Sequence, residues 1–276
     1  MNNNLPDLIV RSTEVRYISA EFHQFRRLHI ETGGSLIVES QSQNWLILDI
    51  EQDVEIRGVF EFNDFSSDLI PVSATLPDGS TITHTFRRRR GGRGGNGGTA
   101  GGQAGGIGAS GGEGFGGGGG GGAVYTKYNG RGPGKPGDGS RGGMSWDNQV
   151  RGGDGGDSTE FLNGGLVYLN VGGVLNCADG VINLVGRPGP VGLSGANGVA
   201  TPGYGRGNGG GGGGGPGGEG GVIIVRANQI TSLPTILLQG GAGGAPGVCG
   251  QGGFGGENGQ SGQSGGAGRR DIRTRS

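Results

Sequence analysis

Between Gly241 and Gly268 a glycine occupies every third position, ten times without a break in phase. A period of three fits neither the 3.6-residue period of the α-helix nor the two-residue period of the strand. It is the period of the polyproline II helix, which forms no hydrogen bonds within itself. An edge made only of glycine lets a second backbone approach closely. The run therefore predicts a polyproline II segment that packs against other segments of backbone.

The same spacing recurs in shorter runs that begin at Gly102 and Gly186, and residues 209–215 are all glycine. Glycine accounts for 75 of the 276 residues and hydrophobic residues for only 30%, which disfavours an ordinary globular core. Collagen would need far more than 11 prolines. A disordered linker would not keep the triplet phase or contain apolar runs such as Val222–Val225. We therefore expect a folded bundle in which neighbouring segments satisfy each other's backbone groups.

Residues 1–86 have a different composition, with few glycines and short runs in which apolar and polar residues alternate. Such alternation is typical of strands with one buried face. At 28–38 and at 54–62 a strand, a glycine turn and a second strand follow one another, which favours a β-helix-like unit over a β-sandwich. The strands expected in this part are Leu8–Val10, Val15–Ile18, Arg27–Ile30, Leu36–Val38, Trp45–Ile50, Val54–Ile56, Val59–Phe62 and Thr81–Thr85.

The predicted fold class is all-β and repetitive, with essentially no α-helix. A β-rich attachment domain at 1–90 ends at four consecutive arginines. A glycine-rich polyproline II bundle with interleaved β-solenoid strands follows at 91–268, and a charged C-terminal tail occupies 269–276. The interleaved strands are expected at Leu166–Val171, Val174–Cys177, Val181–Val185, Val222–Val225, Gln229–Ile230 and Thr235–Gln239.

Charge and apolar content narrow the function classes. The net charge is −1, from 22 basic and 23 acidic residues, so nothing demands a nucleic acid or an anionic membrane as partner. The sequence contains no stretch of 18 apolar residues, so we expect no transmembrane helix. The N-terminal residues show no secretory signal. Cys177 and Cys249 are equally compatible with a disulfide and with two free thiols.

Three motifs suggest chemistry, and each has a simpler interpretation. Arginines before glycine pairs, as at 90–95, resemble RNA-binding RGG segments, but acidic residues balance them and make RNA binding the least favoured function. Residues 152–157 match part of a calcium-binding repeat, but only once. The three histidines lie on strand-like segments without a partner nucleophile. We therefore expect no catalytic residues, no metal site and no cofactor.

Five aromatic residues lie among glycines and charged residues instead of within strands. Aromatic side chains on loops that a rigid scaffold carries are common in recognition surfaces. The alternative is that they cover the ends of the bundle. The candidate receptor-binding residues are Tyr125, Tyr128, Trp146, Tyr204 and Phe254.

This plan resembles the small distal adhesins on the long tail fibres of T-even-like phages. The resemblance rests on Val54–Gly58 in the base, on Gly91–Gly98 and Gly111–Gly122, and on the later glycine runs. In that family a β-rich part attaches to the fibre, and loops at the tip of a polyproline II sandwich contact an outer-membrane protein or a surface glycan. The apolar strands between the glycine runs are more similar to glycine-rich β-solenoid proteins of bacterial surfaces and of other phage fibres.

The resemblance implies a virion protein without enzymatic activity, made in the host cytoplasm without a signal peptide. Residues 1–90 would bind other virion proteins of the fibre or capsid, and the loops would bind a host-surface protein or glycan. No membrane insertion is expected, and homo-oligomerisation stays open. The alternative is a purely structural capsid fibre, decoration protein or extracellular fibre subunit.

Overall fold

The computed structural model describes residues 5–39, 44–63, 72–76, 79–86, 92, 163–194, 197, 211–252 and 257–275, and the backbone alone of 99–100 and 124–125. The part of the chain so described is all-β, with mainly parallel sheets and no helix. This confirms the all-β part of the prediction. The search for an apolar helix of membrane-spanning length, made over the same residues, found none.

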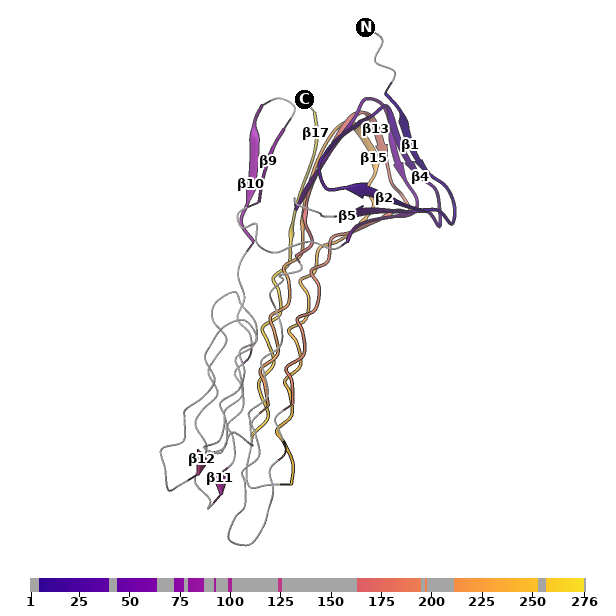
Figure 1. The fold of residues 1–276 in the computed structure, drawn as a ribbon. Helices are drawn as coiled ribbons and strands as arrows, with labels where there is room; N and C mark the ends of the chain where they lie inside the picture. The colour runs from indigo at the N-terminus through magenta and orange to yellow at the C-terminus, as the bar shows by residue number, and fades with distance from the viewer. Residues whose placement is uncertain are drawn as a thin grey trace.

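The chain winds repeatedly past three sides of a triangular stack, and each strand pairs in parallel with the strand one winding away (Figure 1). Side 1 contains β1 (Asp7–Val10), β4 (Arg27–Ile30), β7 (Val54–Ile56) and the C-terminal parts of β13 (Leu166–Asn176) and β15 (Val222–Ser232). Side 2 contains β2 (Val15–Ser19), β5 (Ser35–Glu39), β8 (Val59–Asn63), β14 (Val181–Asn183) and β16 (Thr235–Leu237). Side 3 contains β3 (Phe22–Phe25), β6 (Trp45–Ile50), the N-terminal parts of β13 and β15, and β17 (Arg269–Thr274).

The core fills the space between the three sides with inward-facing columns of apolar residues. On side 2, for example, Leu36, Phe60 and Ile182 are in register on successive strands and are 0–3% exposed. The alternation in the sequence arises because every second side chain of a strand points inward. The cavity that remains among these side chains measures only about 10 Å³, so the interior is packed and has no room for a ligand.

Glycine allows β13 to turn from side 3 to side 1 without ending. A Cβ atom on Gly172 would lie 2.1 Å from the carbonyl oxygen of Glu51 on the winding below. Any other residue would therefore push the two windings apart at this corner. The prediction of two strands at 166–177 was nearly right, because the structure has one continuous strand with a register shift between Val171 and Val174.

A hairpin covers the outer face of side 3. Its strands, β9 (Val72–Thr75) and β10 (Thr81–His84), pair antiparallel. Val72, Ala74 and Phe86 pack with Ile47 and Tyr168 and with other residues of side 3 in a second apolar cluster. The middle of β6 is thus buried on both faces, which explains why Leu46–Leu48 form a continuous apolar run and do not alternate.

The long insertions all leave the stack at the same corner, where side 2 ends and side 3 begins. The chain leaves the stack there after β8, β14 and β16, and it re-enters the stack as β13, β15 and β17, respectively. The last two insertions contain four described extended segments, here named a (184–194), b (211–221), c (238–248) and d (257–268). Figure 1 shows them running side by side away from the triangular stack.

Hydrogen bonds between these segments recur at every third residue. Segment b donates to a, from Gly212 to Leu193 and then in steps of three as far as Gly221 to Leu184, at 2.7–2.9 Å. It donates to d with the same period, beginning with Gly211 to Glu257 at 2.9 Å. Segment b also accepts from Gly241, Gly244 and Gly247 of c, each at 2.8 Å. All its residues are buried, so b is the centre of the bundle.

Nearly all the strands expected from alternation are present, and five strands were missed. The missed strands are β3, β9, β11 (Thr99–Ala100), β12 (Val124–Tyr125) and β17. β17 corrects one expectation directly, because the residues predicted to form a charged tail pair with β15 over six positions. The sheets also contain strands from both sides of the boundary expected at residue 90, for example β6 beside β13.

The long glycine run with which the sequence analysis began comprises two segments. Segment c runs away from the stack and segment d returns, with Gly259, Gly262, Gly265 and Gly268 donating to residues of c at 2.7–3.0 Å. The triplet phase continues through the reversal because both segments need glycine wherever they face a neighbour. A Cβ atom on Gly262, for instance, would lie 1.9 Å from the oxygen of Gly215.

Candidate functional site at the far end of the bundle

Of the five aromatic residues predicted to bind a receptor, one has a described backbone. Tyr125 lies in the two-residue strand β12 (Val124–Tyr125), which pairs in parallel with β11 (Thr99–Ala100). The other four, Tyr128, Trp146, Tyr204 and Phe254, lie outside the described residues.

The far end of the bundle is held together by backbone groups at one level. Gly212 donates to Leu193, Gly247 donates to Gly212, and Gly259 donates to Gly247, at 2.8–2.9 Å. All four segments are therefore tied together where a and c stop running away from the stack. The connection from a to b, and that from c to d, lies beyond this level.

Beyond that level, two asparagine side chains accept hydrogen bonds from the backbone. Asn258 accepts from the backbone N–H of Cys249 at 2.8 Å, and Asn197 accepts from the backbone N–H of Gln251 at 2.9 Å. The second contact joins residues from the two insertions. Sequence reasoning missed both asparagines, although Asn before a glycine is a typical turn residue whose side-chain amide bonds nearby backbone.

The segments present different kinds of side chain to solvent. Segments a and c, which bond to each other through Gly186, Gly189 and Gly192, expose Val191 (61%), Leu193 (55%) and Val248 (54%) near the far end. Segment d exposes polar side chains, Gln260, Ser261, Gln263 and Ser264. Exposed apolar side chains close to the connecting residues are suited to contact another molecule.

The charged side chains of side 1 form a second candidate surface, but they are used in pairs. A shallow hollow there is lined by Asp7, Ile9, Arg27, Leu28, His29, Asp53 and Glu55. Asp7 receives two hydrogen bonds from Arg26, at 2.6 and 2.7 Å, and these bonds lower the pKa of the Asp7 carboxyl. Glu55 contacts His29 at 2.9 Å and Arg57 at 2.5 Å. Charge pairs of this kind, of which His29 and Glu55 face each other on neighbouring strands, stabilise a sheet and do not resemble an active site.

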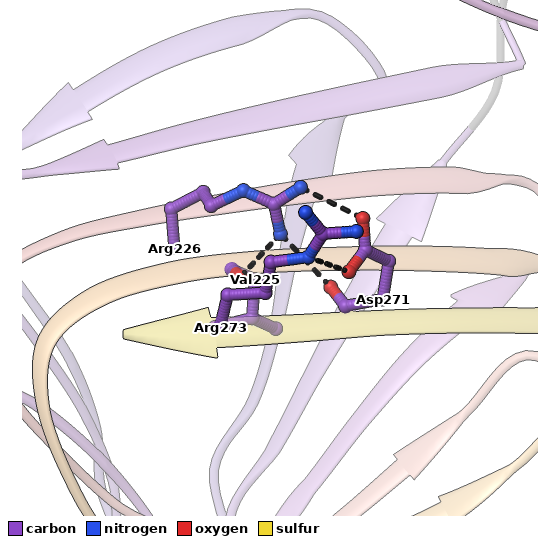
Figure 2. Close-up of polar contacts among 4 residues, drawn as sticks. All are labelled: Val225, Arg226, Asp271 and Arg273. Atoms are coloured by element: carbon purple, nitrogen blue, oxygen red, sulfur yellow. Dashed lines mark hydrogen bonds and ion pairs between the residues drawn. The ribbon is translucent and has the colours of Figure 1, made fainter. Parts of the chain in front are cut away.

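On the outer face of side 3 lies a charged group at the C-terminal edge. Arg226 of β15 and Arg273 of β17 both bond the carboxylate of Asp271, at 2.7 and 2.8 Å (Figure 2). The hydrogen bond from Arg226 is the main reason why the pKa of the Asp271 carboxyl is lowered. Both arginines are thereby engaged with the same carboxylate.

The described part of the chain contains no site suited to metal or thiol chemistry. No group of three or more His, Cys, Asp or Glu side chains gathers there. Cys177 and Cys249 are both free thiols, which answers the question that the sequence left open. Cys177 is in the core, and burial raises its pKa to about 12. A thiol that stays protonated is not a nucleophile.

Comparison with known proteins adds no relative: no protein-family model matches this chain, and no match was found among curated proteins or solved structures.

Proposed function

We propose that this chain is a recognition protein of the phage tail-fibre or adhesin type, without enzymatic activity. Its receptor would be a host-surface protein or glycan, contacted through the parts of the three insertions that contain the candidate residues Tyr125, Tyr128, Trp146, Tyr204 and Phe254. The observation that supports this most directly is the common corner from which the insertions leave. It directs the described segments a to d side by side in one direction, away from the stack.

The bundle is suited to hold loops and poorly suited to bind anything along its length. Its central segment b is wholly buried and consists almost entirely of glycine. Regular backbone bonds on several sides restrict bending. A rigid scaffold with variable connections at one end is a frequent arrangement in recognition proteins.

We also propose the finer fold that goes with this function. The triangular windings would be a β-solenoid, and segments a to d would be polyproline II helices. The three-residue period of the contacts between segments supports the second assignment. The repeated passage over three sides, with parallel pairing at each, supports the first.

The stack would be the part that attaches to the particle. The exposed apolar side chains Ile9, Val15, Tyr17 and Phe22 all belong to the first winding, within the predicted attachment region 1–90. Apolar side chains at this density on one winding favour a protein partner, such as another fibre or capsid subunit. The protein would then be part of the virion.

The test replaces Tyr125, Tyr128 and Trp146 together with Ala and measures binding to a panel of bacterial cells and to a glycan array. The matched control is Tyr17→Ala, which removes an exposed tyrosine from the stack. We expect the triple variant to lose binding and the control to keep it, with identical thermal melts for both. Unchanged binding by a folded triple variant would reject these residues as the site.

The alternative function is a purely structural capsid fibre or decoration protein. A bundle whose segments are joined by backbone hydrogen bonds would also suit that role. Copy number per particle separates the two functions, because a decoration protein covers the capsid in many copies whereas a distal adhesin sits only at fibre tips. A chain that binds no cell, no glycan and no surface protein, and that is spread over the capsid, would favour the alternative.

A further inference from the structure

We propose that Arg16 and Arg270 close the two ends of the three-sided stack and prevent copies of this chain from joining end to end. This proposal does not depend on the proposed function. It concerns the end faces of the stack, where the outermost strands pair on one side only within the described part of the chain. Such strands present backbone groups that could pair with another molecule.

At the N-terminal end the first winding departs from the core pattern at one inward position. Arg16 of β2 is in register with Leu36 of β5, and the column continues through Phe60, Ile182 and Ile236. Leu36, Phe60 and Ile182 are 0–3% exposed, and Ile236 packs against them, whereas Arg16 is exposed.

The guanidinium of Arg16 reaches sideways across the end of the stack. Its Nη1 donates to the carbonyl oxygen of Ile9 on β1 at 3.2 Å. The side chain therefore spans from side 2 to side 1, with its aliphatic stem over the core and its charge in water, as long basic side chains commonly do.

The C-terminal end has the same feature on a different side. Arg270 of β17 is in register with Ile223 of β15, and the column continues through Val167 and Leu46. Those three apolar residues are 0–2% exposed, and Arg270 is exposed. At each end of the stack the outermost strand thus has an arginine where the inner strands of the same column have an apolar residue.

The consequence for association follows from desolvation. A second copy placed on either end would continue the parallel pairing but would bury a guanidinium in an apolar column. Burying an unpaired charge costs far more than the added backbone pairing contributes. Inward-pointing charged residues on edge strands are a known means by which sheet proteins avoid such pairing.

The proposal is tested with the double variant Arg16→Met and Arg270→Met, which keeps the length of each stem and removes the charge. Sedimentation velocity is measured over a 100-fold range of concentration, and electron microscopy shows the shape of any assembly. The native chain should have a sedimentation coefficient that does not change with concentration. The double variant should form end-to-end rods several times the native mass.

Two control variants separate the position from the charge. Arg11→Met with Arg273→Met removes two charges from exposed positions outside the apolar columns, since Arg273 is in register with Arg226, and should behave like the native chain. Arg16→Lys with Arg270→Lys should also stay unassembled. A folded Met variant that does not associate would overturn the proposal. End-to-end association of the native chain would overturn it too, and this measurement needs no variant to fold.

Discussion

Arg226 and Asp271 join the last two strands of side 3 by a charge-assisted hydrogen bond of 2.7 Å between Nη2 and Oδ2, and the two side chains are 26 and 20% exposed. Nη1 of the same arginine also donates to the backbone oxygens of Val225 and Asp271, at 2.9 and 3.2 Å. The pair therefore fixes β17, the edge strand, to its neighbour. Figure 2 shows Arg273 approaching the same carboxylate.

From this relationship we expect Asp271→Asn and Arg226→Gln each to destabilise the stack. The coupling free energy in a double-mutant cycle should be about 1 kcal/mol, because partly covered charge pairs exceed fully exposed ones only modestly. Urea denaturation of the four chains gives this value. Arg269→Gln, on the same strand, is the control and should change the free energy of unfolding less than either member of the pair. A coupling of zero would mean that the bond contributes nothing to β17.

Acid should weaken the stack through the same carboxylates. Asp7 and Asp271 both have a pKa below the ordinary value, because each accepts hydrogen bonds from arginine. A depressed pKa in the folded state means that the unfolded chain binds more protons at low pH. The stabilisation is therefore complete above about pH 5 and is lost as pH falls through about 4 and below. Thermal melts between pH 7 and pH 2 should show this loss, and Asp7→Asn with Asp271→Asn should reduce its slope.

The bundle should reject a single added methyl group at its inner edge. In Gly244→Ala the new Cβ would lie 1.8 Å from the carbonyl oxygen of Pro190, where only backbone stands and nothing flexible can move away. We expect a loss of about 3 kcal/mol or more, at the upper end of overpacking effects. Ala245→Gly, at the exposed neighbouring position, should cost only about 0.5–1 kcal/mol from backbone entropy. Equal melting temperatures for the two variants would contradict the close packing.

The two thiols should differ in reactivity. Cys177 is 0% exposed and its pKa is raised to about 12, so an alkylating reagent at pH 8 should not modify it in the folded chain. Cys249 is only partly covered and should react. Mass spectrometry after brief treatment with iodoacetamide should find one modification in the native chain, none in Cys249→Ser, and two after denaturation. Rapid labelling of native Cys177 would show that the core opens.

The sequence predicts those elements in which side chains alone carry the pattern. Alternation locates β4, β5 and β7 because they have one buried and one exposed face. It misses β17 because four of its six residues are charged: the strand is held by backbone pairing and by Arg226. It misses β3 because a polar His23 occupies an inward position at the open first winding, with its ring stacked on Phe25.

The change of direction between segments c and d could not be predicted from the sequence pattern, for a different reason. Glycine marks every position where backbone meets backbone, whichever way the chain runs, so an uninterrupted phase carries no information about direction. At the far end, Asn197 and Asn258 give a weak local signal, because Asn is common in many turns. Which backbone each asparagine would bond depends on how the two insertions lie together, and no single stretch of sequence encodes that.

The triplet bonding has a consequence for how such a chain could change length over evolution. A segment lengthened by one residue would rotate its remaining glycines away from their neighbours and place side chains against backbone. Only multiples of three preserve the facing edges, and a segment must lengthen together with those that it bonds. Growth is therefore restricted to matched steps of about 9 Å, if each residue advances by the roughly 3.1 Å of a polyproline II helix. The triangular stack would not need to change at all, so the length of the bundle can vary independently of the stack.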